Sequence, residues 1–154
     1  MTLPFPSRRS SHLARGGMGD VYRATDTALG RTVALKLLAE RFSDDEDIRR
    51  RFRNEALAAA RLSNAPFTVT VFDVGETVDQ QPFIVMEFLE GGSLEERLRA
   101  GRPTTADTLR WLDQAGRALD AGHAAGVVHS DVKPGNLLLD ARGAVRVADF
   151  GVAS

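Results

Sequence analysis

Three functional groups lie close together in the segment HSDVKPGN, residues 129–136. Asp131 can accept a hydrogen bond from a hydroxyl and orient it for attack, and Lys133 can hold negative charge on a group being transferred. Asn136 offers a neutral oxygen to a hard cation such as Mg²⁺, which proteins bind through oxygen ligands. Asp149 in the segment ADFG supplies a second hard ligand. This set has no covalent nucleophile, and it indicates phosphoryl transfer, which needs positioning, cations and one acid to guide the acceptor oxygen.

A glycine-rich turn occurs early in the chain, in the segment LARGGMGDVY. Gly16, Gly17 and Gly19 let the backbone approach a ligand closely, and their free N–H groups suit phosphate oxygens. Such a turn is weak evidence by itself, because tight hairpins use it too. It lacks the G-K-[ST] ending of a Walker-type loop, so a phosphate-binding lysine must come from elsewhere.

Period-two alternation predicts two strands, 20–26 and 31–38, joined in a hairpin at Leu29-Gly30. On the second strand this alternation places Ala34 and Lys36 on the same face. Prolines in the first few residues discourage a strand before about Ser11, which predicts an irregular tail over residues 1–10.

Ser43 followed by Glu46 predicts a capping box that opens a long helix. At 100° per residue Glu55 falls on the apolar stripe of this helix, whereas Arg49, Arg50 and Arg53 point elsewhere. A buried carboxylate must be paired, and Lys36 is the candidate partner. Glu55 at the edge of the stripe, reaching water, explains the pattern equally well.

The second half of the chain is predicted to be mostly helical. Ser93 is expected to cap a short helix, and Thr104 with Asp107 to begin a long one. The apolar stripe of the long helix consists of Leu109, Leu112, Gly116, Leu119 and His123. Strands with one helix, followed by helices, predict an α+β fold.

Composition excludes several classes of protein. The chain has 154 residues, a formal net charge of −1 and no cysteine. The charge gives no reason to expect a nucleic-acid or anionic-membrane partner. Without cysteine there are no disulfides or thiolate metal sites, which fits a cytoplasmic protein. No apolar run is long enough to suggest a membrane-spanning helix or a secretory signal.

Taken together, the segments ARGGMGDV, VALK, VMEFLEGGSL, HSDVKPGN and DFG occur in the order in which protein kinases carry them. With the inward helix residue Glu55, the chain resembles the eukaryotic-type serine/threonine protein kinases, in particular their bacterial branch. The resemblance runs from about Leu13 to the end of the chain. It implies a kinase-like α+β fold with a β-rich N-terminal lobe (11–90) carrying one regulatory helix, and a mainly helical, incomplete C-terminal lobe (91–154).

The resemblance implies ATP and Mg²⁺ as cofactors and a protein Ser/Thr hydroxyl as acceptor. Asp131 is the implied catalytic acid/base, Lys133 steadies the γ-phosphate, and Lys36 contacts the α- and β-phosphates while Glu55 holds it. Asn136 and Asp149 are the implied Mg²⁺ ligands. The implied nucleotide-binding set, with Met86 as gatekeeper and a hinge near 87–92, is Leu13, Ala14, Gly16, Gly17, Gly19, Val21, Ala34, Lys36, Met86, Glu87 and Leu89.

The sequence departs from the family pattern at two positions within the matching segments. Ala14 replaces the first glycine of the phosphate loop, which is tolerable where the local φ is negative. Ser130 replaces the arginine that in this family binds a phosphate on the activation loop, and serine cannot make that bidentate contact. We therefore expect activity that does not depend on activation-loop phosphorylation. His129 is expected to be a packed core histidine.

The chain ends at Ser154, three residues past Gly151. We therefore expect an incomplete C-terminal lobe of poor stability, whose long helix exposes its apolar stripe and offers a surface for self-association. Two alternatives to a protein kinase stay open. One is a truncated, pseudokinase-like module that binds nucleotide without turnover. The other is a small-molecule phosphotransferase, which HSDVKPGN alone would permit but GGMGDVY, VALK and DFG together disfavour.

Overall fold

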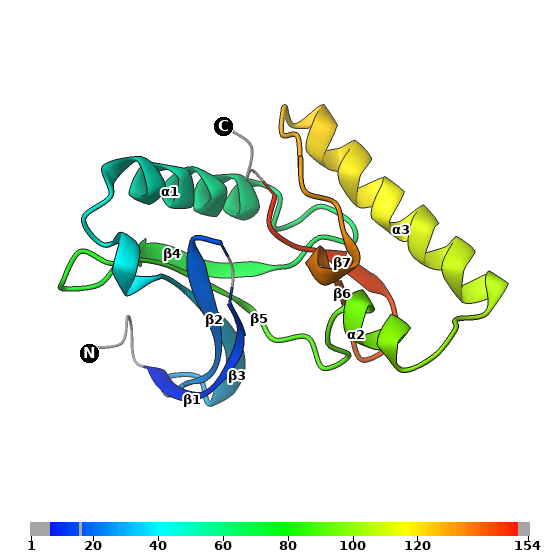
Figure 1. Cartoon of the computed structure of the whole chain (residues 1–154), viewed down its shortest axis with the longest axis horizontal. Helices are drawn as coiled ribbons and strands as arrows, with labels where there is room; N and C mark the ends of the chain where they lie inside the picture. The colour runs from blue at the N-terminus through cyan, green and yellow to red at the C-terminus, as the bar shows by residue number, and fades with distance from the viewer. Residues whose placement is uncertain (1–6, 16, 151–154) are drawn as a thin grey trace. The chain divides into compact units, whose positions relative to one another are not determined.

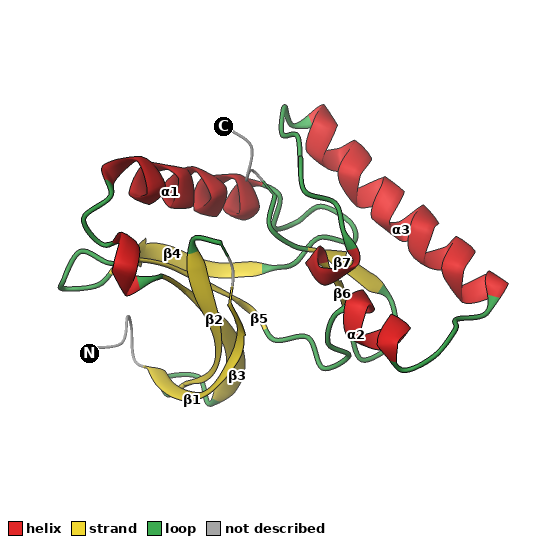
Figure 2. Ribbon diagram, in the orientation of Figure 1, coloured by secondary structure: helices red, strands yellow, loops and turns green. Residues whose placement is uncertain are grey.

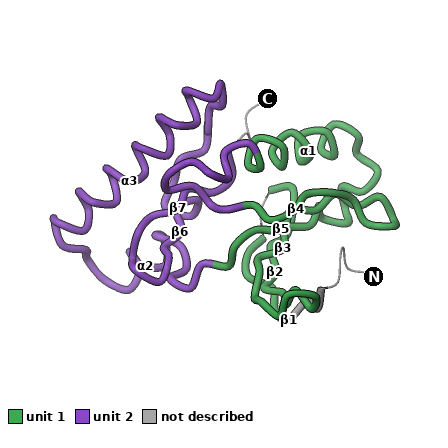
Figure 3. Tube along the Cα trace, turned by 180° about the vertical axis from the view of Figure 1, so that it is seen from behind, with its two compact units in different colours: residues 1–60, 71–88 green, residues 61–70, 89–154 purple. Residues whose placement is uncertain are grey.

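The structure, a computed structural model, describes residues 7–15 and 17–150. It has the predicted α+β character, with antiparallel strands and helices (Figures 1 and 2). The chain divides into two compact units, shown in different colours in Figure 3. The first contains residues up to 60 together with 71–88, and the second contains 61–70 together with 89–154.

The sequence-based division at residue 90 puts the segment 61–70 in the first lobe, but in the structure this segment belongs to the second unit. Backbone hydrogen bonds explain this placement. The Val69 N–H donates to the Val147 carbonyl at 3.1 Å, and the Val147 N–H donates to the Phe67 carbonyl at 2.8 Å. These partners are distant in sequence, so no local sequence pattern predicts that they pair.

The first unit is built on a five-stranded antiparallel sheet in the order β1-β2-β3-β5-β4. Its elements are β1 (Ser7–Arg15), β2 (Gly19–Asp26), β3 (Arg31–Leu38), a 3-10 turn (Glu40–Phe42), α1 (Glu46–Arg61), β4 (Val71–Glu76) and β5 (Pro82–Glu87). The two faces of the sheet carry separate apolar clusters. One cluster consists of Ala24, Val33, Leu35, Leu37, Phe83 and Val85. In the other, Phe52 and Ala56 of α1 pack on Leu38 and Ile84.

The predicted hairpin is confirmed, with Asp26 opposite Arg31 at its closed end. The Asp26 carboxylate accepts hydrogen bonds from the Ala28 and Leu29 N–H groups at 3.0 and 3.1 Å. Gly30 has φ of +65°, a conformation that glycine adopts without steric cost. The turn is therefore specified by its own residues, which is why the sequence predicts it well.

Two details near the helix and strand starts differ from expectation. Strand β1 begins at Ser7, within the stretch expected to be irregular; residues 1–6 lie outside the described part of the chain. The capping box of Ser43 and Glu46 is wrong, because α1 is capped by Asp45. The Asp45 carboxylate accepts from the N–H groups of Asp47 and Ile48, both at 3.1 Å. Ser43 instead closes the preceding 3-10 turn.

The second unit contains two helices and a short hairpin. Its elements are α2 (Leu94–Arg99), α3 (Thr105–Ala124), a 3-10 turn (Pro134–Asn136), β6 (Leu137–Leu139) and β7 (Val145–Val147). The predicted caps are both present. Ser93 and Glu96 form a reciprocal capping box on α2, and the Thr104 hydroxyl accepts from the Asp107 N–H at 3.1 Å on α3.

Helix α3 packs through a face that the periodicity did not single out, consisting of Trp111, Ala115, Ala118 and Gly122. Trp111 is buried, and its indole N–H donates to the Gly143 carbonyl at 3.1 Å. In the predicted apolar stripe, Leu109 and Leu112 are exposed, in agreement with the expectation that this stripe lies at the surface.

Candidate active site

Lys36 and Glu55 form a buried ion pair in the first unit. The Lys36 ammonium donates to Glu55 Oε1 at 2.5 Å, and the two residues are only 6% and 1% exposed. Strand β3 places Lys36 on the face that α1 covers, where Phe52 and Ala56 pack on the sheet. The predicted pairing is therefore present, and the alternative that Glu55 reaches water is excluded. Two buried charges persist only when paired, so each holds the other in place.

Four residues of the implied nucleotide-binding set share this face of the sheet. Val21 lies opposite Lys36, and Ala34 lies opposite Met86. Because side chains on a strand alternate, Ala34 and Lys36 point to the same side. Glu87 ends β5 and is partly buried, and Leu89 lies in the second unit. The register thus brings Val21, Ala34, Lys36 and Met86 together on one face of the sheet.

The glycine-rich turn joins β1 to β2. Gly16 lies outside the described residues, and Leu13 is half exposed at the end of β1. Ala14 pairs with Val21 in the sheet and is not among the non-glycine residues with positive φ, so its methyl group is tolerated there. A Cβ atom at Gly17 would meet nothing within 4 Å, which leaves its backbone open to a ligand.

Gly19 is required for packing. A Cβ atom at this position would lie 2.4 Å from the Leu37 carbonyl oxygen and 3.1 Å from the Phe52 ring. We expect Gly19→Ala to lower the free energy of unfolding by about 1–3 kcal/mol, because β2 and β3 must separate to admit the methyl group. Gly17→Ala is the matched control and should leave stability within about 0.5 kcal/mol. Urea denaturation of the two variants measures the difference, and equal midpoints would contradict it.

The second unit gathers the polar groups of HSDVKPGN around the Asp131 carboxylate. Asn136 donates from Nδ2 to the Asp131 backbone carbonyl at 2.8 Å and to Asp131 Oδ2 at 3.3 Å. The Lys133 ammonium lies 3.4 Å from the same Oδ2. Asn136 is buried, whereas the side chains of Asp131 and Lys133 are about half exposed. A carboxylate held in this way by a cation and an amide keeps one orientation while remaining open to an acceptor hydroxyl.

His129 is buried in the core, as expected, and it stabilises this loop through hydrogen bonds. Its Nε2 lies 2.6 Å from the Ala148 carbonyl, and its Nδ1 accepts from the Asp131 N–H at 3.1 Å. Nε2 therefore carries the proton, because Nδ1 acts as the acceptor. The ring packs edge-on against Phe150 at 4.9 Å between centroids. His129 thus fixes the backbone of Asp131.

Ala148 connects this loop to Asp149. Its N–H donates to the Asn136 carbonyl at 2.9 Å, while its carbonyl contacts His129. Asp149 follows directly, with φ of +61°, and Ser130 has φ of +68°. Left-handed backbone is uncommon outside glycine and concentrates at functional sites. Sequence reasoning missed the role of Ala148, because a backbone carbonyl leaves no signature in the residue type.

The residues present fit a hard cation such as Mg²⁺. The side-chain amide nitrogen of Asn136 donates to Asp131. The Asn136 Oδ1 atom is therefore the one that can serve as a metal ligand. Asp149 contributes a carboxylate one residue beyond Ala148, which bonds to Asn136. An amide oxygen and a carboxylate are the hard oxygen donors that Mg²⁺ prefers.

No helix in the described part of the chain is both long enough and apolar enough to cross a membrane.

Comparison with known proteins identifies the family of the chain. The family model described as protein kinase domain matches residues 7–154. The serine/threonine-protein kinase PknA of Mycobacterium tuberculosis is 44% identical over an alignment of 158 residues, which covers 99% of this chain and 36% of PknA. PknE of Mycobacterium bovis, also a serine/threonine-protein kinase, is 44% identical over 150 residues, covering 97% of this chain and 26% of PknE. The chain thus spans about a third or less of the length of these relatives.

Solved structures show the same fold. The crystal structure of the Mycobacterium tuberculosis PknI kinase domain superposes with a TM-score of 0.78 at 31% sequence identity, covering 99% of this chain and 62% of the PknI chain. The chain therefore belongs to the protein kinase family, and within it to the serine/threonine-protein kinases.

Proposed function

We propose that the protein transfers the γ-phosphoryl group of ATP to serine or threonine hydroxyls of protein substrates. The observation that carries this proposal is the arrangement around Asp131, whose carboxylate is oriented by Asn136 and Lys133. In the reaction the acceptor oxygen forms a bond to the γ-phosphorus, the bond to the β-phosphate bridging oxygen breaks, and ADP leaves. Asp131 receives the proton of the acceptor hydroxyl.

Each unit supplies its own share of the proposed machinery. In the first unit, Lys36 binds the α- and β-phosphates in the orientation that Glu55 imposes, and the backbone of Gly17 and Gly19 covers phosphate oxygens. Val21, Ala34 and Met86 form the apolar face against the adenine, and the backbone of residues 87–89 hydrogen-bonds its edge.

In the second unit, Lys133 steadies the γ-phosphate beside Asp131. Asn136 and Asp149 would hold Mg²⁺, which supplies neutralisation of phosphate charge when bound. Lysine two residues after the aspartate matches the serine/threonine pattern. The regulatory role of Ser130 and a location in the cytoplasm stay predictions.

Transfer of label from γ-labelled ATP tests the proposed function. With Mg²⁺ present, we expect label on hydroxyls of a protein acceptor and none on added small-molecule acceptors. Lys36→Met should remove the transfer, because the phosphates lose their cation. Label on the small molecule would instead identify a small-molecule phosphotransferase. Stabilisation by ATP without any transfer would identify a nucleotide-binding module.

A further inference from the structure

Arg49 is a buried cation on α1, whereas the arginines that follow it in the helix are not buried. The helical periodicity places it away from the apolar stripe of α1, yet in the structure it is only 8% exposed. Arg50 and Arg51, the next two residues, are exposed. A guanidinium is almost never buried unless it is paired, so the surroundings of Arg49 must supply its partners.

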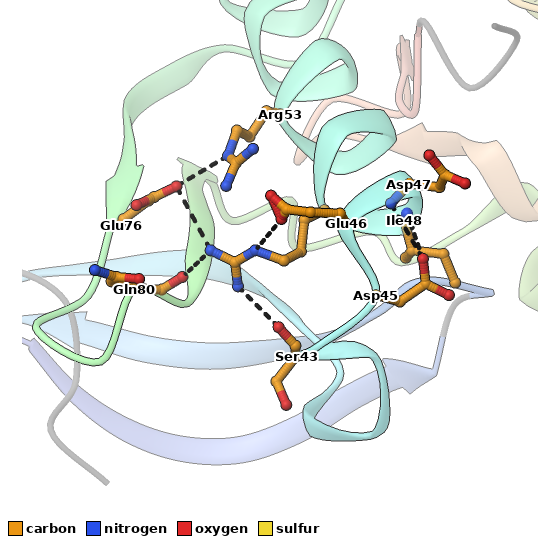
Figure 4. A network of polar contacts seen from close by, with 9 residues as sticks. Ser43, Asp45, Glu46, Asp47, Ile48, Arg53, Glu76 and Gln80 are labelled. Carbon is orange, nitrogen blue, oxygen red and sulfur yellow. Dashed lines mark hydrogen bonds and ion pairs between the residues drawn. The ribbon is translucent and has the colours of Figure 1, made fainter.

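Figure 4 shows these partners, which come from three parts of the first unit. Arg49 donates from Nη1 to the Ser43 carbonyl at 3.2 Å and from Nη2 to the Gln80 carbonyl at 2.5 Å. Its guanidinium also lies 3.6 Å from the Glu46 carboxylate and 3.9 Å from Glu76. Gln80 has φ of +61°, so the turn between β4 and β5 is held in an uncommon conformation that presents this carbonyl.

A second arginine strengthens the attachment to β4. Arg53, one helical turn after Arg49, donates from Nε to Glu76 at 2.9 Å. The Glu76 carboxylate therefore forms ion pairs with both arginines (Figure 4). The start of α1 is thus tied by directional bonds to the end of β4 and to the turn that follows.

The same sheet carries Lys36. Glu76 pairs with Pro82 at the edge of β5, and Ile84, two residues on, lies opposite Lys36. Apart from these arginine contacts and the Lys36–Glu55 ion pair, α1 packs on the sheet through apolar side chains, among them Phe52 and Ala56. Apolar contacts are non-directional, so they resist separation of helix and sheet more than rotation of the helix. The hydrogen bonds of Arg49 have a required geometry and do resist rotation.

We propose that Arg49 is a positioning residue that holds α1 in the rotation at which Glu55 meets Lys36. Rotation of the helix would pull the guanidinium away from the Gln80 carbonyl and from Glu76, and losing these bonds at a buried cation is costly. Glu55, six residues further along α1, is therefore held toward Lys36. The contacts of Arg49 do not depend on the proposed function. Only their expected consequence, correct placement of the ATP phosphates by Lys36, rests on it.

The chain offers a direct assay, because Lys36 and Lys133 are its only lysines. Lys36 is buried against Glu55, whereas the Lys133 side chain is 58% exposed and serves as an internal reference. We would treat the full chain with an amine-acylating reagent and measure the ratio of Lys36 to Lys133 modification by mass spectrometry. Arg49→Gln should raise this ratio about fivefold, because local opening exposes the Lys36 amine.

Matched variants separate positioning from general loss of stability. Arg50→Gln removes the same charge from an exposed neighbour and should leave the ratio unchanged. Val33→Ala destabilises the opposite face of the sheet and should leave the ratio near that of the unmodified chain in the absence of denaturant. A ratio unchanged in Arg49→Gln, or raised equally in Val33→Ala, overturns the proposal.

Two further measurements keep the result interpretable. Should Arg49→Gln fail to fold, Glu76→Gln replaces it, with a smaller rise of the ratio expected and Asp47→Asn as the exposed control. An unchanged ratio in Glu76→Gln would then overturn the proposal. ATP with Mg²⁺ should lower the acylated fraction of Lys36 itself in the unmodified chain; this fraction is measured directly, because Lys133 is also placed at the nucleotide. Absence of that protection counts against the proposed function, while the effect of Arg49→Gln, measured without nucleotide, still decides the role of Arg49.

Discussion

Asp131→Asn is expected to lower the rate of phosphoryl transfer about 10²–10⁴-fold, the range typical for loss of a general acid or base. The asparagine is nearly isosteric and can still contact Lys133 and Asn136, so the loop keeps its shape. It cannot take a proton from the acceptor hydroxyl. Single-turnover transfer of label from γ-labelled ATP measures the loss.

Nucleotide binding should survive this change, because no phosphate contact is assigned to Asp131. We expect the ATP-dependent rise in melting temperature of Asp131→Asn to match that of the unmodified chain. Asp113→Asn is the matched control, since Asp113 is an exposed carboxylate on α3 that pairs with Arg117 at 3.0 Å. Transfer that persists at the original rate in Asp131→Asn would show that another group guides the acceptor.

Glu55→Ala is expected to lower the free energy of unfolding by about 3–5 kcal/mol, the usual cost of breaking a buried ion pair from one side. Lys36 would lose its counter-charge at a site with almost no access to water. Urea denaturation measures the loss. Asp47→Ala is the control on the same helix, since Asp47 pairs with Arg50 in an exposed position, and it should cost about 1 kcal/mol or less.

The double replacement Lys36→Met with Glu55→Leu distinguishes stability from function. Because both charges are removed together and the volume is filled, we expect it to recover most of the stability lost in Glu55→Ala. It should nevertheless lose ATP-dependent stabilisation, because no cation remains for the phosphates. A double variant that still binds ATP with unchanged affinity would remove Lys36 from the proposed site.

Residues that act through local rules are well predicted by the sequence. The hairpin of β2 and β3 follows from alternation and from Asp26 and Gly30 in its turn. Ser93 and Thr104 cap their helices because an N-cap bond joins residues three apart. The order of the kinase segments likewise depends on residue types alone, and this order is sufficient to indicate the family.

Contacts between distant segments determine the features that the sequence pattern could not predict. Periodicity places Glu55 on the buried stripe but cannot distinguish burial from an edge position, and the pairing with Lys36 decides this. The same periodicity places Arg49 away from the apolar stripe. It cannot predict that Arg49 is buried, because its partner Gln80 lies 31 residues away in the chain. The cap of α1 shifts from Ser43 to Asp45, because the intervening 3-10 turn takes up Ser43.

Residue types and short-range spacing are enough to predict the family, the charged groups and most local turns and caps, since each depends on residues close together in the chain. Long-range packing fixes which charges are buried, which face of α3 packs, and the membership of residues 61–70 in the second unit. A polar group is buried only where a partner from another segment compensates its loss of water, and the spacing within one segment does not reveal that partner.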